Sequence, residues 1–152
     1  MATVFAITPE HGYALAAMAF TGLLGQWHAI VVGTARKAAG VPYPNAYVTH
    51  EDAEKDIKKY QFNCAQRSHA NYMENLAVVF PLMVASAPLY PMATAVLGGI
   101  WSVGRIFYTL GYKSSKQGDG GKGRYQGVFY NIGQLGLLIT AGMSVYKMCC
   151  PQ

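Results

Sequence analysis

The sequence predicts an all-α integral membrane protein built as a bundle of four transmembrane helices. Among its 152 residues, 52% are apolar and only 12% are charged, which is about half the charged share of a soluble globular domain. Most of the charges fall in two stretches, Arg36–Lys59 and Lys113–Arg124. The apolar stretches between them are long enough to cross a bilayer, which takes roughly 20 helical residues. Residues 1–152 are therefore expected to form a single membrane domain.

Four apolar segments are expected to span the membrane: residues 13–35, 62–87, 92–112 and 125–146. Residues 36–61 are expected to be a loop, because Gly40-Val-Pro-Tyr-Pro44 contains residues that stop a helix. Residues 113–124 are rich in glycine and are expected to be flexible. The short uncharged turn at 88–91 makes the second and third spans an antiparallel hairpin.

The basic residues predict the orientation of the bundle and the kinds of partner it has. Both long loops carry several lysines and arginines while the turn at 88–91 carries none, so both loops should face the cytosol. The net charge of +5 is not concentrated on one helix with interleaved aromatic residues, so no nucleic acid is expected as a partner. The cysteines Cys64, Cys149 and Cys150 lack the spacing of a disulfide framework or a metal site, so no metal is expected.

A cation, an amide and an anion share one face of the second span. Arg67, Asn71 and Glu74 follow one another at i, i+4 and i+7, and at about 100° per residue the last lies within roughly 20° of the first. The third span carries a second polar stripe near its end, formed by Arg105, Tyr108 and Tyr112. Because the two spans are antiparallel, the two stripes should lie at the same depth.

These polar groups favour a small ligand with at least two anionic groups and one cationic group. Arginine binds carboxylates bidentately and keeps its charge when partly buried, and a glutamate among arginines stays ionised and can accept an ammonium. Glutathione has this chemistry, and a nearby guanidinium would favour its nucleophilic thiolate. Two other interpretations stay open. The same residues could form salt bridges that only hold the helices, or they could belong to a channel or transporter, although they lie at one interface rather than across the midplane.

Several motifs follow one another along nearly the whole chain: Ala35-Arg-Lys37, Val41-Pro-Tyr-Pro44, Phe62-Asn-Cys-Ala-Gln-Arg67, Gln66-Arg-Ser-His-Ala-Asn-Tyr-Met-Glu74, and Arg105-Ile-Phe-Tyr108 with Gly111-Tyr112. The segment from Gln66 to Glu74 fits the pattern RxxxNxxE. In this combination the sequence resembles the membrane-associated proteins in eicosanoid and glutathione metabolism, the MAPEG family.

The resemblance implies a four-helix protomer, a homotrimer, and glutathione as a co-substrate held between adjacent subunits. It implies that one subunit binds glutathione through Arg67, Asn71, Glu74, Tyr108 and Tyr112, with Arg105 in the same polar network. It implies that the neighbouring subunit contributes Arg36 and His69. The position of the family's thiolate-activating arginine holds Asp119 here, so the catalytic candidate is Arg124, with Lys122 and Lys116 behind it.

The activity that the resemblance implies is that of a microsomal glutathione transferase with glutathione-dependent peroxidase activity. Its substrates would be lipophilic electrophiles or lipid hydroperoxides, and its location the endoplasmic reticulum or the outer mitochondrial membrane, with the site facing the cytosol. One alternative is a non-catalytic, lipid-presenting member of the same fold, which the presence of Asp119 keeps open. The other is a conjugating enzyme of the leukotriene C4 synthase type, which Asn75 disfavours because that enzyme has a tyrosine there.

Overall fold

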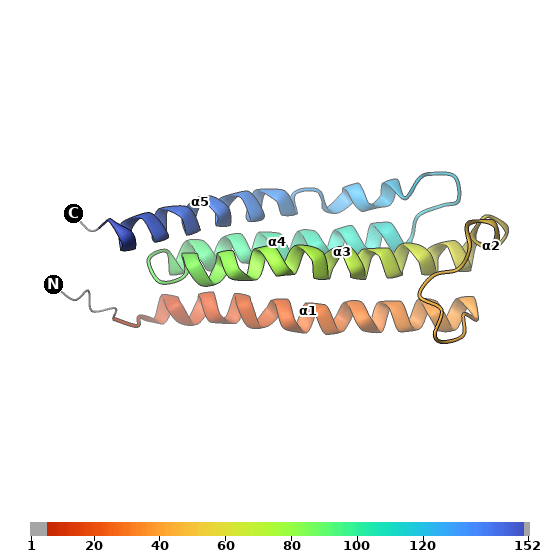
Figure 1. Cartoon of the computed structure of the whole chain (residues 1–152), viewed down its shortest axis with the longest axis horizontal. Coiled ribbons are helices and arrows are strands. Elements are labelled where there is room, and N and C mark those ends of the chain that lie inside the picture. Colours follow the sequence, from red (N-terminus) through yellow and green to blue (C-terminus); the bar gives the residue numbers. More distant parts are fainter. Residues whose placement is uncertain (1–5, 151–152) are drawn as a thin grey trace.

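A computed structural model describes residues 6–150, and they form an all-helical bundle. The elements in chain order are α1 (Pro9–Ala39), α2 (His50–Lys55), α3 (Ile57–Ser86), α4 (Pro91–Lys113), the 3-10 helix η1 (Lys122–Gly127) and α5 (Tyr130–Cys149). The long helices lie alongside one another, and the start of α1 and the end of α5 are at one end of the bundle (Figure 1). The short helix α2 and the connection from α4 to η1 lie at the opposite end. We call this opposite end the loop end.

The predicted hairpin of the second and third spans is confirmed as α3 and α4. α3 runs through Pro81 and ends at Ser86, and α4 begins at Pro91, where a proline fits because the first helical N–H needs no partner. The main apolar core contains five side chains with no exposed surface, Tyr72, Val79 and Met83 of α3, Trp101 of α4 and Leu137 of α5, together with Leu24 of α1. This core fixes the depth of α3 against α4, which positions the two polar stripes.

The prediction of a continuous loop over residues 36–61 is wrong. α1 continues to Ala39, where Gly40 adopts a left-handed conformation (φ 63°) and its N–H bonds to the Lys37 carbonyl at 3.3 Å. This glycine cap stops the helix later than the first charged residues suggested. Thr49 caps α2 by accepting from the Asp52 N–H, and Asp56 caps α3 by accepting from the Lys58 N–H. Residues of these types commonly start helices, and here they do so within the charged stretch.

The fourth helix begins later than predicted. Residues 122–127 form η1 and α5 starts at Tyr130, whereas the expected span began at residue 125. η1 lies directly against the end of α4, where Gly123 meets Gly111. A Cβ atom on Gly123 would overlap the Gly111 carbonyl, so this approach of two backbones requires glycine. The close contact brings the loop that follows α4 back onto the bundle.

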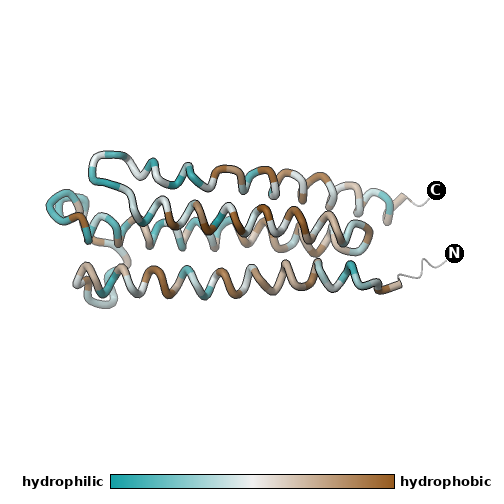
Figure 2. The backbone as a smooth tube through the Cα atoms, turned by 180° about the vertical axis from the view of Figure 1, so that it is seen from behind, coloured by the Kyte–Doolittle hydropathy of each residue, from teal (hydrophilic) through white to brown (hydrophobic). Residues whose placement is uncertain are grey.

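The outside of the bundle is largely apolar. Leu23 of α1 is 69% exposed and Ile132 of α5 is 63% exposed, and many other large aliphatic side chains face outward. Figure 2 shows hydrophilic residues concentrated at the loop end and hydrophobic residues along the helices. Among the helices of residues 6–150, only α1 is identified by length and apolar composition as able to cross a membrane. The inner helices α3 and α4 carry internal charges such as Arg67 and Arg105, which lower their mean hydropathy.

Candidate functional site

The polar stripe of the second span forms as predicted on α3. Arg67 donates through Nη1 to Glu74 Oε1 at 2.7 Å and through Nη2 to Glu74 Oε2 at 3.3 Å. This two-pronged geometry is the one by which arginine matches a carboxylate. The two side chains are 46% and 55% exposed, so the pair is open at the surface and can exchange its partners for charged groups of a ligand.

Arg105 joins the stripe of α4 to the stripe of α3. Its side chain has no exposed surface, and its Nη2 donates to Asn71 Oδ1 at 2.8 Å. This contact confirms that the two stripes lie at the same depth. The Arg105 Nε and Nη1 atoms are buried without a hydrogen-bond partner among the described residues. A buried guanidinium with two unused donors is suited to an oxygen-rich ligand, because unpaired buried donors cost free energy.

Aromatic rings surround the Arg105 guanidinium and continue towards the loop end. Its Cζ atom lies 4.5 Å from the Tyr108 ring centroid and 4.8 Å from that of Tyr130, at distances typical of cation–π contacts. The rings of Tyr108 and Tyr112 meet edge to face at 5.7 Å. The Arg124 Cζ then lies 5.6 Å from the Tyr112 ring centroid. The predicted residues Arg105, Tyr108, Tyr112 and Arg124 are therefore a contiguous series.

Arg124 is fixed by its own loop. Its Nη1 donates to the carbonyls of Gly120 at 2.7 Å and Gly121 at 2.9 Å, and its Nη2 donates to the Tyr125 hydroxyl at 3.1 Å. Gly121 is in the left-handed region (φ 69°) and lies against the Tyr112 ring, where a Cβ atom would collide. These contacts hold the guanidinium beside Tyr112 and at the edge of the polar stripes.

Asp119 organises the loop between α4 and η1. Its carboxylate accepts from the Lys116 N–H at 2.9 Å, the Gly121 N–H at 2.7 Å and the Tyr60 hydroxyl at 3.2 Å. Burial opposes ionisation of this carboxyl group, but the donors from Lys116, Gly121 and Tyr60 outweigh it and lower the pKa of Asp119. The sequence predicted a flexible loop here, whereas the structure shows one held against α3 by these bonds.

A second contact of the same loop reaches α2. The Gln117 amide donates to the carbonyls of Ala53 at 2.9 Å and Glu54 at 3.1 Å. The helix α2 was absent from the sequence prediction, so this contact could not be expected. In residues 6–150, neither the Lys116 nor the Lys122 ammonium has an ion pair or hydrogen bond to the polar stripes. Arg124 is thus the basic side chain of this loop that reaches the series of tyrosines.

The two residues expected to act from a neighbouring subunit lie apart from the series. Arg36 donates to the Asn45 carbonyl at 2.7 Å and has its Cζ 4.7 Å from the Phe62 ring centroid, so it is engaged by its own chain. His69 follows Arg67 by two positions, which is about 200° around α3, and its ring centroid is 6.2 Å from that of His28. The single chain does not bring Arg36 or His69 to the Arg67–Glu74 pair.

A buried polar network lies next to Arg105, and the sequence did not predict which of its residues bond one another. His28 of α1 lies with Nε2 2.7 Å from Thr109 Oγ1, which in turn is 2.6 Å from Ser68 Oγ. The His28 ring stacks on Tyr72 with centroids 4.2 Å apart. Through these contacts, four residues join α1, α3 and α4 to one another next to Arg105. Single polar residues within apolar segments gave no signal of pairing, because only the tertiary structure brings them together.

Removing the amide of Asn71 should destabilise the protein even without a ligand. Asn71→Ala takes from the buried Arg105 the one hydrogen bond that its guanidinium makes to the described residues. A hydrogen bond to a charged group contributes about 1.5–3 kcal/mol, so thermal unfolding in detergent should show a loss of that size. The matched control is Asn131→Ala, whose amide bonds only to the exposed Val128 carbonyl, with a loss on the order of 0.5 kcal/mol. Equal losses for the two variants would contradict this role for Asn71.

The comparison with known families agrees with the motifs and the fold. The model of the MAPEG family matches residues 14–146, which include most of the four long helices. MAPEG proteins are membrane-embedded, and the family includes glutathione transferases and related enzymes of lipid metabolism. A membrane location accounts for the apolar outside of the bundle, since lipid tails can cover side chains such as Leu23 and Ile132. By its motifs, its helical fold and this match over most of its length, the chain belongs to the MAPEG family.

Proposed function

We propose that the protein is a microsomal glutathione transferase with glutathione-dependent peroxidase activity. Its motifs resemble those of microsomal glutathione S-transferase 3 in the same order along the chain. The observation that carries the proposal is the contiguous polar series, which runs from Asn71 through Arg105, Tyr108 and Tyr112 to Arg124. The exposed Arg67–Glu74 pair lies on the same face of α3 as Asn71.

Glutathione is matched to this series group by group. Arg67 and Arg105 offer donors for its two carboxylates, and Glu74 offers an acceptor for its ammonium. Arg124 stands at the end of the series next to Tyr112, with its guanidinium oriented by the Gly120 and Gly121 carbonyls. A cation near the thiol favours the thiolate, which is the reactive nucleophile. In this assignment Arg124 lowers the pKa of the bound thiol, while the other residues hold glutathione in place.

Two reactions follow from a bound thiolate at a membrane surface. In conjugation, the sulfur forms a bond to an electrophilic carbon of a lipophilic substrate and displaces its leaving group. In peroxide reduction, the sulfur attacks a hydroperoxide oxygen, giving an alcohol and a sulfenic acid, which condenses with a second glutathione to a disulfide and water. The apolar surface of the bundle gives lipid-dissolved substrates a route to the site.

We further propose a homotrimer in the endoplasmic reticulum membrane, with all four long helices spanning it and the loop end facing the cytosol. Arg36 and His69 would then complete a glutathione site formed between two subunits. The basic residues gathered at the loop end support this orientation. This role of Arg36 and His69 rests on the resemblance to the family, and in one chain both residues lie away from the series.

The proposal is tested with protein purified in detergent. We expect saturable glutathione binding, conjugation to a reactive aryl halide and reduction of a lipid hydroperoxide. Arg67→Met together with Glu74→Gln should weaken glutathione binding at least about tenfold, since two charge-assisted contacts are lost. Glutathione binding without either reaction would sink the enzyme assignment and favour the non-catalytic, lipid-presenting alternative. Efficient conjugation to a leukotriene precursor would favour the leukotriene C4 synthase type.

Neutralising Asp119 should impair Arg124 indirectly. Asp119→Asn removes an acceptor of the Lys116 and Gly121 N–H groups, and Gly121 in turn holds Arg124. We expect kcat to fall about three- to tenfold, the pH profile to move to higher pH, and KM for glutathione to change little. The wild-type contact is complete above the ordinary carboxyl pKa and is lost as the pH falls through the lowered pKa of Asp119.

The control for Asp119 is Asp52→Asn, which changes an acidic residue of α2 whose carboxylate pairs with Lys59 of α3 at 3.6 Å and not with a residue of the loop. This variant should leave the pH profile unchanged. An Asp119→Asn protein with a normal pH profile would show that Asp119 does not position Arg124.

A further inference from the structure

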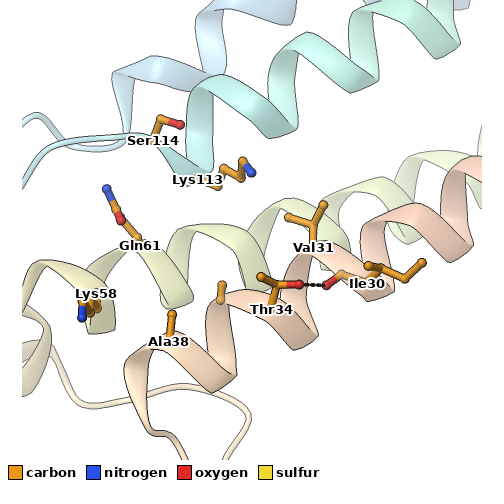
Figure 3. Close-up of a pocket in the computed structure, with 9 residues that line it drawn as sticks. Ile30, Val31, Thr34, Ala38, Lys58, Gln61, Lys113 and Ser114 are labelled. Atoms are coloured by element: carbon orange, nitrogen blue, oxygen red, sulfur yellow. Dashed lines mark hydrogen bonds between the residues drawn. The ribbon is translucent and has the colours of Figure 1, made fainter.

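A cavity of about 320 Å³ lies between α1, α3 and α4 near the loop end (Figure 3). One wall is aliphatic and comes from α1, where Ile30 and Val31 line it. Figure 3 shows α1 on one side of the space and the end of α4 on the other. The polar rim is formed by side chains of α3 and of the end of α4: Lys58, Gln61, Lys113 and Ser114.

This cavity lies on the other side of α3 from the Arg67–Glu74 pair of the proposed glutathione site. Lys58 precedes Arg67 by nine positions on α3, which places it about 180° around the helix from the polar stripe. α1 packs against α3 and α4 and forms the opposite wall of the cavity, as Figure 3 shows. A ligand bound here would therefore contact other side chains than glutathione does.

The rim carries two cations without acidic partners. Within the part of the chain that the structure describes, the ion pairs of basic side chains use His50, Lys55, Lys59 and Arg67. Lys58 and Lys113 have none, although both border the same cavity. An anionic ligand in this cavity would meet two lysines whose charge is not neutralised by an acidic side chain of the described residues. The rim therefore favours an anionic group.

The opposite wall favours hydrocarbon. Ile30 is 62% exposed, and Leu23, seven positions earlier on the same face of α1, is 69% exposed. Together they continue the aliphatic wall from the cavity along the bundle and away from the loop end. Lysines at the end of membrane helices typically reach the headgroup level with their ammonium groups. The cavity thus presents cations at headgroup level and an apolar track below them.

We propose that this cavity binds an anionic phospholipid of the surrounding leaflet. Its phosphate lies between the Lys58 and Lys113 ammonium groups, and an acyl chain follows Ile30 and Leu23. The cavity holds about as much space as ten water molecules in the liquid, which suits a phosphate with the first atoms of its glycerol ester. Basic pockets between helices on one side of a membrane are typical of lipid headgroup binding.

The test uses full-length protein in a neutral detergent, titrated with short-chain phosphatidic acid and, in parallel, with phosphatidylcholine of the same chain length. Bound lipid is counted by native mass spectrometry. The wild-type protein should bind phosphatidic acid more tightly than phosphatidylcholine. The double variant Lys58→Gln with Lys113→Gln should bind phosphatidic acid about thirtyfold more weakly, which is the scale expected for two lysines near an anionic headgroup.

Two further variants separate this cavity from a general attraction to basic residues. Lys37→Gln with Lys55→Gln removes the same charge from residues that do not line the cavity and should leave phosphatidic acid binding unchanged. Ala38→Phe fills the cavity without changing the charge and should weaken phosphatidic acid binding as much as the lysine pair does. Circular dichroism checks that each variant is folded.

Three results would overturn the proposal. Equal binding of phosphatidic acid and phosphatidylcholine by the wild-type protein would show that the cavity does not select an anionic headgroup. Equal losses of phosphatidic acid affinity for the two lysine pairs, or normal binding by Ala38→Phe, would show that the lipid does not bind in this cavity. A free fatty acid could also compete at the same concentrations as phosphatidic acid and depend in the same way on Lys58 and Lys113. That result would show that the cavity binds a fatty acid carboxylate rather than a phospholipid. If glutathione binding is unchanged in all these variants, the lipid result does not depend on whether the proposed enzymatic function is correct.

Discussion

Replacing Arg124 with alanine should lower the rate of glutathione conjugation at pH 7 by about a hundredfold. Arg124 is the basic side chain of its loop that contacts Tyr112, and its guanidinium is fixed by the Gly120 and Gly121 carbonyls. Without this cation the pKa of the bound thiol should return towards the ordinary thiol range, about 8.5. The fraction of thiolate at pH 7 then falls by one to two orders of magnitude.

The measurement is a pH titration of the thiolate absorbance of bound glutathione, together with the rate of conjugation. Because thiolate forms again at higher pH, the Arg124→Ala rate should recover as the pH rises through the new pKa. Glutathione affinity should change only a fewfold, since Arg67, Asn71 and Glu74 are intact. Lys122→Ala, which removes a cation from the same loop, is the matched control and should keep the wild-type pKa. A thiol pKa that moves with Lys122 and not with Arg124 would reverse this assignment.

Placing a methyl group on Gly104 should strongly destabilise the packing of α5 against α4. A Cβ atom on Gly104 would lie 2.7 Å from Tyr130 Cβ and 2.8 Å from the Tyr130 Cα and backbone N. Backbone atoms at that distance cannot be moved by a rotamer change, so α5 must shift away from α4. Overpacking of this kind typically costs about 1–3 kcal/mol. The melting temperature of Gly104→Ala in detergent should fall by roughly 5–10 °C.

Gly99→Ala is the control for Gly104, because it lies on the same helix and a Cβ atom there would have no neighbour within 4 Å. This variant should keep or slightly raise the melting temperature, since alanine favours the helix over glycine. Gly104→Ala should also displace the Tyr130 ring from Arg105, whose Cζ lies 4.8 Å from the ring centroid, and so weaken glutathione binding. Equal melting temperatures for the two variants would show that α5 can move aside without cost.

Much of the bundle could be predicted from local sequence patterns. The turn at 88–91 lies between two long apolar segments, so an antiparallel hairpin followed directly. Helical periodicity placed Arg67, Asn71 and Glu74 on one face of α3. The contact of Arg105 with Asn71 confirms the prediction that this stripe and the stripe of α4 lie at the same depth. The loop at 36–61 was predicted less well, because the helix-stopping residues in Gly40-Val-Pro-Tyr-Pro44 do not show where the next helix begins. Capping residues such as Thr49 and Asp56 start helices within charged sequence.

The site near Arg124 could be predicted only in part. Its basic residue was identified by its position after Tyr112, but its contacts depend on a loop whose conformation is set by distant groups. Tyr60 of α3 bonds Asp119 in this loop, and Gln117 of the loop bonds the backbone of α2. Such bonds join residues about 60 positions apart, and no periodic pattern marks them. The bonds that join His28 to Thr109 and Thr109 to Ser68 could not be predicted for the same reason.

The sequence by itself determined the helical class, the hairpin of α3 and α4, the polar stripes and the family. It could do so because helix periodicity, glycine and proline breaks, and charge distribution are properties of neighbouring residues. Only the tertiary structure decided which cation of the 113–124 loop meets Tyr112, and that Lys58 and Lys113 border one cavity. The first of these depends on the close approach of backbones at Gly111 and Gly123, and the second on how α1, α3 and α4 lie together. Both are set by the packing of whole helices rather than by any local pattern.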